Sequence, residues 1–404
     1  MKFEQGACGL LPIGVVIIVN SERIRSLFAA KEAEFHRLLT CLPAASIVLG
    51  MRAMIVKEFR ELVRDRRTLG LLIMMPLLLL VIFGYAANFY VSSLKTAVVG
   101  PQASQVAAQL PSLFNVTVTQ SSGTKADAEK LLQDNKVDVA FVAGQTPVLA
   151  LVNGSNLFAA QSAVAALNKA GNKVKTQVLY NPDLKTSWVM VPAIIGLILT
   201  FIGTIITSIG MVREREAGTL EQLAVMPIKP SQVILGKIAP YFLVASVDMV
   251  IVTVLGILLF GVPFNGNPFA FALGAAIFLF VTLGLGVFIS TISQTAGQAI
   301  QTAFFFLLPQ ILLSGMIFPL EAMAAGVRWI GYLLPLTYFT MISQGIMLRG
   351  APITSLWLPF GVLTVMAVVV FTGATLRFRR DLAPGTPASP AGKQPAAAQT
   401  VSTA

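Results

Sequence analysis

The chain has 404 residues, of which 55% are hydrophobic and only 12% are charged. A soluble globular chain usually carries about a quarter charged residues, so this composition excludes an ordinary soluble protein and indicates one whose main solvent is the lipid bilayer. The formal net charge of +11 does not indicate a nucleic-acid-binding protein, because the basic residues cluster at the ends of apolar runs, where the positive-inside rule places them.

The first fifty residues do not form a convincing membrane span. The apolar run from Ala7 to Val19 is shorter than the roughly 20 residues that cross a bilayer. Its basic flank and cleavage site are also poorly formed for a signal peptide. Residues 1–50 are therefore interpreted as a dispensable or wrongly assigned extension, with Met51 or Met54 as the functional start.

A basic helix precedes the first predicted span. In residues 52–67 the apolar side chains fall on one helical face and basic side chains cover the rest, which is typical of an amphipathic helix on the cytosolic membrane surface. Residues 69–91 are the first predicted span. It contains Pro76, which membrane helices tolerate when neighbouring groups satisfy the freed carbonyl.

Residues 92–187 are predicted to form a small α/β domain outside the cytosol. Short apolar runs alternate there with helical ones. The stretch contains lysines but no arginine, and long domains cross the membrane largely regardless of charge. The predicted strands are Val116–Thr119, Val137–Val142 and Val148–Val152, and the predicted helices are Ala126–Asn135 and Leu157–Ala170.

The remaining sequence contains further apolar runs long enough to cross a membrane. These predicted spans are 188–212, 238–260, 269–292, 298–318 and 355–376. In the first of them Gly196, Gly203 and Gly210 recur at heptad spacing, which predicts close helix packing. Residues 319–350 are half apolar and rich in aromatic residues, so they are predicted to be a re-entrant or interfacial element on the outer side.

The predicted fold is therefore an α-helical polytopic membrane protein with six transmembrane helices and an α/β extracytoplasmic domain between the first and second. The basic flanks at 52–67, 213–237 and 377–380 all favour the cytosol. An even number of spans places both termini on that side. Residues 377–404 are predicted to be a basic stop and a disordered tail rich in Pro, Ala, Ser and Thr.

The sequence has little that would support enzyme chemistry. It lacks a G-x-x-x-x-G-K-[ST] phosphate loop, because no glycine stands at the required spacing before Lys237. The single histidine, His36, and the cysteines Cys8 and Cys41 all lie in the doubtful extension, which excludes a His-based triad or a Cys/His metal site in the body of the protein. We expect no enzyme, and no metal or cofactor bound by this chain.

The cytosolic loop 213–237 is the most informative passage. Thr219 and Gln222 have capping-box spacing, which predicts a short helix that begins after Gly218 and ends before Pro227. A short rigid helix between two spans is suited to dock into a partner and to convert its movement into tilting of the spans. The alternative, an ordinary loop that only joins two helices, remains open.

The run from Arg213 to Pro230 resembles the first cytosolic loop of bacterial ABC type-2 exporter permeases. The resemblance continues, in the family's order, from Met54 to Arg380. One departure is Asn153, where the family usually has an acidic residue, which weakens any role for that position. Further matching segments are Ile234–Tyr241, Val152–Asn156, Tyr180–Pro182, Leu313–Pro319 and Leu334–Phe339.

The resemblance implies a half-transporter of the bacterial inner membrane. It implies pairing with a second permease, as a homodimer or a heterodimer, and with cytosolic ATP-binding subunits that hold the ATP and magnesium. The residues implied to couple to the ATPase are Glu214, Arg215, Glu216, Gly218, Thr219, Glu221 and Pro227. Those implied to form the outer gate are Ser314, Gly315, Phe318, Pro319, Pro335 and Tyr338.

Asp248 is the single carboxylate near the middle of a predicted span. An ionised acid there costs a few kcal/mol even on the mild insertion scale, so it is expected to face a cavity or a partner. Two roles stay open: contact with a substrate or cation, and a structural hydrogen bond or protonated acid. Gln294, Gln298 and Gln301 are predicted to share a helical face, where interhelical hydrogen bonding is the preferred interpretation.

The sequence thus predicts an exporter permease that moves a hydrophobic or amphipathic substrate out of the cytosol with ATP hydrolysed by a separate subunit. One alternative is a secondary transporter, which would be expected to show internal repeats with broken helices; no convincing repeat is found. The other is a receptor or assembly protein acting through the α/β domain, which would predict larger cytosolic elements. The sequence names no substrate.

Overall fold

The computed structural model describes residues 93–144, 146–169, 174–218 and 230–381, with Val91, Gly171 and isolated positions between 56 and 81; side chains at 230–233 and 378–381 are not described. The chain divides after Leu69 into two units, and the α/β domain and the membrane helices both belong to the second. The predicted extension, interfacial helix and tail from residue 382 lie outside the described residues. So does most of the first predicted span, although its described positions from Gly70 to Val81 are helical.

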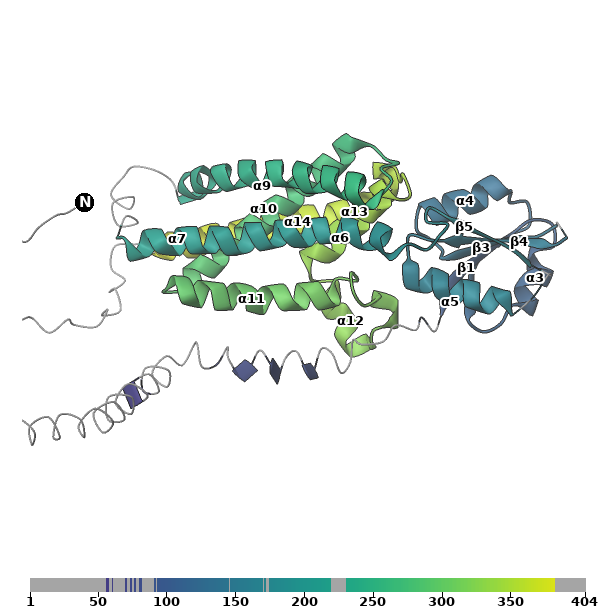
Figure 1. Ribbon diagram of the computed structural model, residues 1–404, viewed down its shortest axis with the longest axis horizontal. Helices are drawn as coiled ribbons and strands as arrows, with labels where there is room; N and C mark the ends of the chain where they lie inside the picture. The colour runs from purple at the N-terminus through teal and green to yellow at the C-terminus, as the bar shows by residue number, and fades with distance from the viewer. Residues whose placement is uncertain are drawn as a thin grey trace, which may run out of the picture. The chain divides into compact units, whose positions relative to one another are not determined.

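The α/β domain is built on a five-stranded sheet with strand order β2-β1-β3-β4-β5 (Figure 1). Only β3 and β4 pair antiparallel; the other neighbours are parallel. The strands are β1 (Leu94–Val99), β2 (Phe114–Gln120), β3 (Val139–Val142), β4 (Val148–Asn153) and β5 (Val174–Leu179). The helices are α3 (Ala103–Gln109), α4 (Lys125–Gln133) and α5 (Leu157–Asn168).

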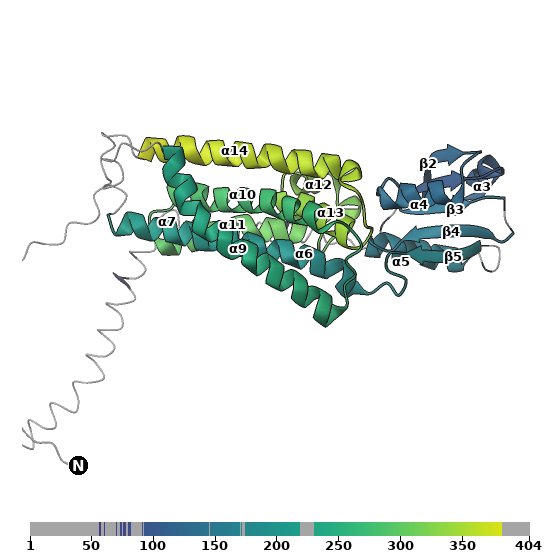
Figure 2. The same cartoon turned by 90° about the horizontal axis from the view of Figure 1, so that it is seen from above.

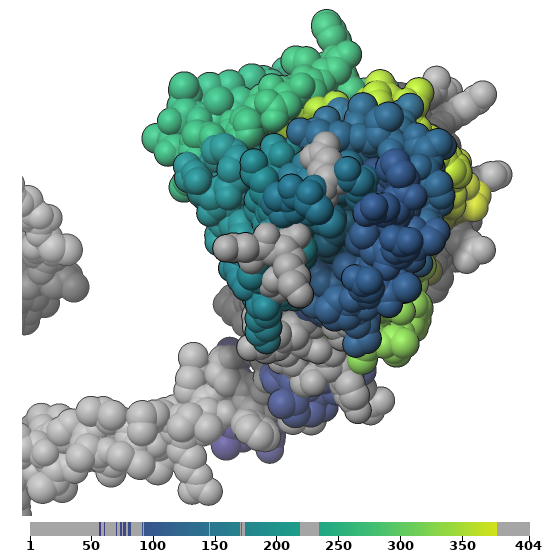
Figure 3. All heavy atoms as spheres, turned by 90° about the vertical axis from the view of Figure 1, so that its right-hand side faces the viewer, coloured from purple at the N-terminus to yellow at the C-terminus, as the bar shows by residue number. Residues whose placement is uncertain are grey.

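Helices cover both faces of this sheet (Figure 2). On one face α3 and α5 pack against a core that includes Phe141. On the other, α4 places Leu132 against Ala97 and Ala140. The central strands read as continuous apolar runs because both of their faces are buried, and fully burying a side chain such as Leu132 contributes roughly 1.5–3 kcal/mol. The edge strand β2 and helix α3, dark blue in Figure 3, lie at the surface of the domain.

In the part of the chain that the structure describes, five helical segments are long and apolar enough to cross a membrane. The first combines α6 (Thr186–Phe201), the π-helical η2 (Ile202–Ile206) and α7 (Thr207–Glu216). The others are α9 (Pro230–Phe260), α10 (Pro268–Ile292), α11 (Ala296–Leu313) and α14 (Trp357–Asp381), the last preceded by η4 (Ile353–Leu356). Between α11 and η4 lie η3 (Leu320–Ala322), α12 (Ala325–Gly331) and α13 (Pro335–Met347).

Three helix ends differ from the predicted spans. The helix predicted to end at residue 212 continues to Glu216, because side chains of its charged last turn contact α9, α10 and α11. The helix predicted to begin at 238 begins at Pro230, a residue that suits a first helical turn since it has no N–H to leave unpaired. The fifth run, predicted to reach 318, ends at Leu313 because Gly315 adopts a φ of +85°.

Helix α10 is the centre of the helical part. In an apolar stretch of 18 residues, 61% of α10 is buried, against 22% for α9 and for α14. Its approach to η2 depends on glycine. A Cβ on Gly286 would lie 2.7 Å from the carbonyl oxygen of Gly203 and 2.9 Å from that of Thr204. The three glycines at heptad spacing do not face a single helix. Gly196 lies against Phe339 of α13, Gly203 against Thr282 of α10, and Gly210 against Tyr241 of α9.

Candidate functional site

The last turn of α7 is tied to the turn between α10 and α11. Nη1 of Arg215 donates to the carbonyl oxygens of Ser290 and Ser293, both at 2.9 Å. These carbonyls belong to the end of α10, where the last acceptors of a helix have no intrahelical donor and carry partial negative charge. Arg215 therefore caps α10 with a positive charge.

The next residue, Glu216, makes the complementary contact at the start of α11. Oε1 of Glu216 accepts a hydrogen bond of 3.1 Å from the backbone N–H of Ala296, the first residue of α11. Helix N-termini favour anions for the same reason that C-termini favour cations. The adjacent charges Arg215 and Glu216 thus hold the end of one helix and the start of the next, which gives this part of the charged motif a physical explanation.

A third contact joins the same turn to α9. Glu214 forms an ion pair with Lys237, so the end of α7 reaches α9, α10 and α11. Beyond it the chain leaves the helix at Gly218, whose φ of +72° suits a glycine that ends a helix. Glu214, Arg215 and Glu216, predicted to lie in a loop, are thus helical. Three further predicted coupling residues, Thr219, Glu221 and Pro227, lie outside the described residues.

Contrary to the prediction, Gln294, Gln298 and Gln301 do not all lie on one helical face. Gln294 precedes α11, which begins at Ala296, so it does not share a helical face with the other two. Oε1 of Gln298 accepts from the backbone N–H of Gln294 at 3.0 Å, a local bond that stabilises the α10–α11 turn. Oε1 of Gln301 is buried without a hydrogen-bond partner among the described residues.

The predicted outer-gate residues gather between α11 and α13. Gly315 makes the left-handed turn that ends α11, Phe318 is buried at 3% exposure, and Pro335 begins α13. The hydroxyl of Tyr338 donates to the carbonyl oxygen of Tyr332 at 2.6 Å, which fixes the link between α12 and α13. The side-chain oxygen of Ser314 is buried and has no partner in the described part of the chain.

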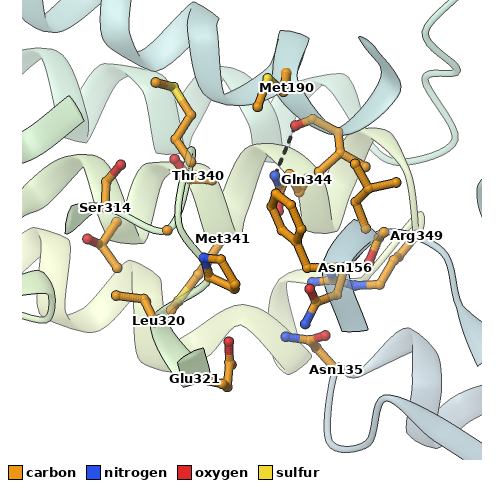
Figure 4. A pocket seen from close by; sticks show the side chains of 18 residues that line it. Asn135, Asn156, Met190, Ser314, Leu320, Glu321, Thr340, Met341, Gln344 and Arg349 are labelled. Carbon is orange, nitrogen blue, oxygen red and sulfur yellow. Dashed lines mark hydrogen bonds between the residues drawn. The ribbon is translucent and has the colours of Figure 1, made fainter. Parts of the chain in front are cut away.

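These residues adjoin a pocket between the membrane helices and the α/β domain (Figure 4). Ser314, Gly315 and Pro319 line it from one side, and Asn135 and Asn156 line it from the domain. Its volume is about 100 Å³, well below the roughly 300–1,000 Å³ of a pocket for a drug-sized ligand. In this conformation the pocket has room for a small polar group and not for a whole hydrophobic substrate.

Two matching segments of the domain meet beside this junction. Asn153 is fully buried; its Oδ1 accepts from both the backbone N–H and the hydroxyl of Ser155, at 3.1 and 2.7 Å. The neighbouring Gly154 has no room for a side chain, because a Cβ would lie 2.7 Å from the carbonyl oxygen of Leu179 and 2.9 Å from that of Asn181. An uncharged residue at 153 therefore organises the turn that presents Ser155 to the junction.

Sequence reasoning missed Arg349, the residue that joins the two parts. It is only 6% exposed; Nε donates to the carbonyl oxygen of Gln133 at 3.2 Å and Nη1 to the hydroxyl of Ser155 at 2.9 Å. In return, Nε2 of Gln133 donates to the carbonyl oxygens of Arg349 and Gly350, each at 3.2 Å. The available signal was an isolated arginine in a half-apolar segment with few charges.

Asp248 lies on α9 at the edge of its buried face, beside the buried residues Ala245 and Met249. Its Oδ2 is buried, and within the described residues it makes no hydrogen bond. The structural hydrogen bond that sequence reasoning allowed for is therefore not made by this atom.

Asp138, which precedes β3, has a carboxyl whose pKa depends on folding. Oδ2 accepts from the backbone N–H of Lys95 at 3.0 Å and Oδ1 from Nδ2 of Asn156 at 3.3 Å. Burial, followed by the negative charge of Glu321, raises the pKa of this carboxyl above 3.8, and these hydrogen bonds oppose the rise only in part.

Asp138→Asn is expected to raise the thermal unfolding midpoint near pH 7. A carboxyl whose pKa is raised by folding destabilises the folded state above that pKa, and the cost disappears as the pH falls towards 3.8. The gap between variant and wild type should therefore close on acidification. The control is Asp183→Asn, which alters an acid whose side chain is 71% exposed. A gap for Asp138→Asn that does not change with pH would contradict the prediction.

Comparison with known proteins gives one consistent family. Residues 66–376 match the ABC-2 family transporter protein. The probable multidrug ABC transporter permease YbhR of Escherichia coli (strain K12) is 28% identical over 382 residues, which cover 86% of this chain and 100% of YbhR. The probable multidrug ABC transporter permease YbhS of the same organism is 29% identical, covering 82% and 97%. Its inner membrane transport permease YhhJ is 38% identical over 52% of this chain and 56% of YhhJ.

Proposed function

Since the chain belongs to the ABC-2 family of transporter proteins and is the membrane permease subunit of an ABC exporter, we propose that energy enters it through the last turn of α7. ATP and magnesium are held by a separate cytosolic subunit. That subunit docks beside Glu214–Glu216 and the loop that follows. The hydrogen bonds of Arg215 and Glu216 to the α10–α11 turn, called the grip below, are the observation that carries the proposal.

The grip supports a defined sequence of movements. A displacement of α7 by the ATPase reaches the end of α10 through Arg215 and the start of α11 through Glu216. Helix α11 leads to Ser314 and Gly315 of the proposed outer gate. Closure of the ATPase would thus tilt α11, open the gate and release a hydrophobic or amphipathic substrate on the outer side. The multidrug transport in the names of YbhR and YbhS supports that substrate class.

The exposed apolar side chains of α9 and α14 support a second permease and lipid as neighbours. Leu258 and Leu259 of α9 are 73% and 72% exposed, and Val369 of α14 is 63% exposed. Side chains of this kind on a continuous surface are unfavourable in water but suit a bilayer or a second apolar subunit. The second permease is a copy of this chain or a sister chain.

The proposed topology has six spans, with 69–91 as the first, the α/β domain outside the cytosol and both termini inside. A cysteine replacing the exposed Asp183 of the domain should react with a membrane-impermeant thiol reagent added to spheroplasts. A cysteine replacing the exposed Ala217 should react only after the membrane is opened. Both variants need Cys8 and Cys41 removed. The reverse pattern of labelling would contradict the topology.

Co-purification and vesicle transport test the function directly. The tagged chain in mild detergent should retain an ATP-binding subunit, and export into inverted vesicles should require hydrolysable ATP. If no such subunit is retained and export does not depend on nucleotide, the proposed function is wrong. Export driven by an ion gradient alone would favour a secondary transporter, and ligand binding without export would favour a receptor.

Asp248→Asn is expected to reduce export of cationic substrates about tenfold and to leave neutral substrates unchanged. The proposed role is contact with a cationic group, because the buried Oδ2 of Asp248 has no hydrogen-bond partner among the residues that the structure describes. A loss of about 1.4 kcal/mol in binding corresponds to tenfold. Export should be compared at equal expression, with Ser246→Ala on the same helix as the control. Unchanged export of every cationic substrate would exclude this role.

A further inference from the structure

The contact between the α/β domain and the membrane helices is polar. Among the described residues, each buried apolar cluster lies wholly within the domain or wholly within the membrane part. No shared apolar core therefore holds the domain in place. Hydrogen bonds join the two parts instead: Arg349 donates to Gln133 and Ser155, and Gln133 donates back to the carbonyl oxygens of Arg349 and Gly350.

Arg349 follows the end of α13 and contacts both parts. Its Nε donates to the carbonyl oxygen of Gln133 at 3.2 Å, and its Nη1 donates to the hydroxyl of Ser155 at 2.9 Å. Figure 4 shows it beside Asn156 of the domain. On the other side, a Cβ on Gly345 of α13 would lie 3.1 Å from its Nη2, so this glycine leaves the space that the guanidinium occupies. One side chain thus joins the domain to the end of α13.

This joint buries a positive charge without a buried anion. Within the part of the chain that the structure describes, Arg349 forms no ion pair, and burial lowers the pKa of its guanidinium to about 10. Asp134 opposes that shift at longer range, but its carboxylate is paired with Lys136. A charge removed from water is costly unless it is paired. If the two parts separate, hydration of Arg349 therefore offsets part of the hydrogen bonding that is lost.

The link between the domain and α6 has the geometry of a hinge. Tyr180 and Leu184 have φ values of +67° and +49°, a region that residues other than glycine rarely adopt. The side chain of Asn181 holds this turn, because it accepts from the N–H of Lys185 at 2.9 Å and donates to the carbonyl oxygen of Lys185 at 3.0 Å. Residues in such conformations cluster at switch regions, and a hinge needs only a few loop residues.

We propose that Arg349 is a positioning residue for the outer gate. The Arg349 joint, formed by Arg349, Gln133 and Ser155, holds the α/β domain against the end of α13 while the gate is closed. Its release lets the domain move about its link to α6 and frees α13, whose other end begins at the gate residue Pro335. This inference rests on the proposed outer gate, but release of the joint is measured without transport.

Distances between spin labels test the joint in the full-length chain in nanodiscs. Labels on Lys125→Cys of α4 and Phe269→Cys of α10, both at exposed positions, should give one narrow distance distribution once both native cysteines are removed. Arg349→Gln should add a population at longer distances. Gln133→Ala, which removes two of the four hydrogen bonds of the joint and keeps its charge, should add a smaller one.

A cysteine in the gate tests what the joint controls. Ser314 is 2% exposed and its hydroxyl has no hydrogen-bond partner among the described residues, so Ser314→Cys is a conservative change. In the chain without native cysteines, a membrane-impermeant thiol reagent should label it severalfold faster in Arg349→Gln than with Arg349 present.

Asn153→Asp is the variant that should tighten the joint. Oδ1 of Asn153 accepts from the hydroxyl of Ser155, which in turn accepts from Arg349, so a carboxylate of the same shape supplies the missing negative charge. This variant should raise the thermal unfolding midpoint, slow the labelling of Ser314→Cys and lower ATP-driven export severalfold. A joint with a merely structural role would be stabilised by the same change without loss of export.

Asn265→Ala is the matched control. Nδ2 of Asn265 donates to the carbonyl oxygen of Leu348 at 2.8 Å, next to Arg349 but from the membrane part. This variant should lower the thermal unfolding midpoint and leave the distance distribution and the labelling rate unchanged. If Arg349→Gln does not fold, Gln133→Ala decides.

Two results would overturn the proposal. One is an unchanged distance distribution in the folded variants of the joint, and the other is a raised midpoint with undiminished export in Asn153→Asp. Failure of the proposed function gives a different result: the wild type would show no ATP-dependent export, while the spin-label distances would still respond to Arg349→Gln.

Discussion

Replacing Arg215 with alanine is expected to reduce ATP-driven export at least about tenfold while the protein remains folded in the membrane. The change removes two charge-assisted hydrogen bonds to the carbonyl oxygens of Ser290 and Ser293. Hydrogen bonds to charged groups contribute on the order of 1.5–3 kcal/mol each, less where water screens them, and each 1.36 kcal/mol of a barrier changes a rate about tenfold. Losing the grip should therefore uncouple α7 from α10 without removing core packing.

Export into inverted vesicles and ATP hydrolysis by the complex should be measured together. In Arg215→Ala, hydrolysis should continue while export falls, which is the signature of uncoupling. Arg213→Ala is the matched control, because Arg213 lies on the same helix end and is exposed. Glu216→Gln, which keeps an acceptor for the N–H of Ala296 but loses its charge, should give an intermediate loss. Equal export by the Arg213 and Arg215 variants would contradict the proposed grip.

Gly286→Val is expected to abolish most of the folded protein. The first atom of any side chain at this position would lie within 3 Å of two backbone carbonyl oxygens and of the Cβ of Thr207. Backbone atoms cannot turn away as a flexible side chain can, so η2 and α10 would have to separate. Overpacking costs typically 1–3 kcal/mol and occasionally more, and separating α10, the most buried of the five long apolar helices, from its neighbour lies at the upper end.

Detergent-solubilised protein should be assayed by size-exclusion chromatography and thermal unfolding. Gly286→Ala should have a lowered midpoint, and Gly286→Val should be mostly aggregated. Gly361→Ala in α14 is the control: the site is exposed and a Cβ would meet nothing within 4 Å, so the variant should be neutral or slightly more stable. A folded Gly286→Val protein with an unchanged midpoint would mean that α10 and η2 do not pack this closely.

The α/β domain shows what local patterns reveal and what they miss. The strands β2, β3 and β4 and the helices α4 and α5 lie where the sequence predicted strands and helices. The strands β1 and β5 and the helix α3 were not predicted. Strand β5 has no fully buried position and alternates only between half-buried and exposed ones, and β1 pairs in parallel with partners distant in the sequence. Parallel pairing leaves no turn signal between neighbouring strands.

The candidate sites likewise have features that local sequence reveals and contacts that it does not. The charged motif at 213–216 could be recognised from its sequence, but its partners at 290–296 are about 80 residues away, and no local pattern specifies that contact. The importance of Arg349 likewise depends on Ser155, a residue 194 positions earlier. The sequence singled out the segments as candidates; the packing of the helices determines what each charged side chain touches.

The helical segment from Thr186 to Glu216 runs without a break for 31 residues, on the order of 45 Å at the usual rise per residue. It joins the wall of the junction pocket, through Val189 and Met190, to the contacts of Arg215 and Glu216 with the α10–α11 turn, where the ATPase is proposed to dock. One continuous helical segment therefore links the pocket to the proposed docking region of the ATPase. Thermodynamic reciprocity applies to any binding at these two places. By whatever factor docking of the ATPase changes the affinity of the pocket for a ligand, binding of that ligand must change the affinity of the ATPase by the same factor.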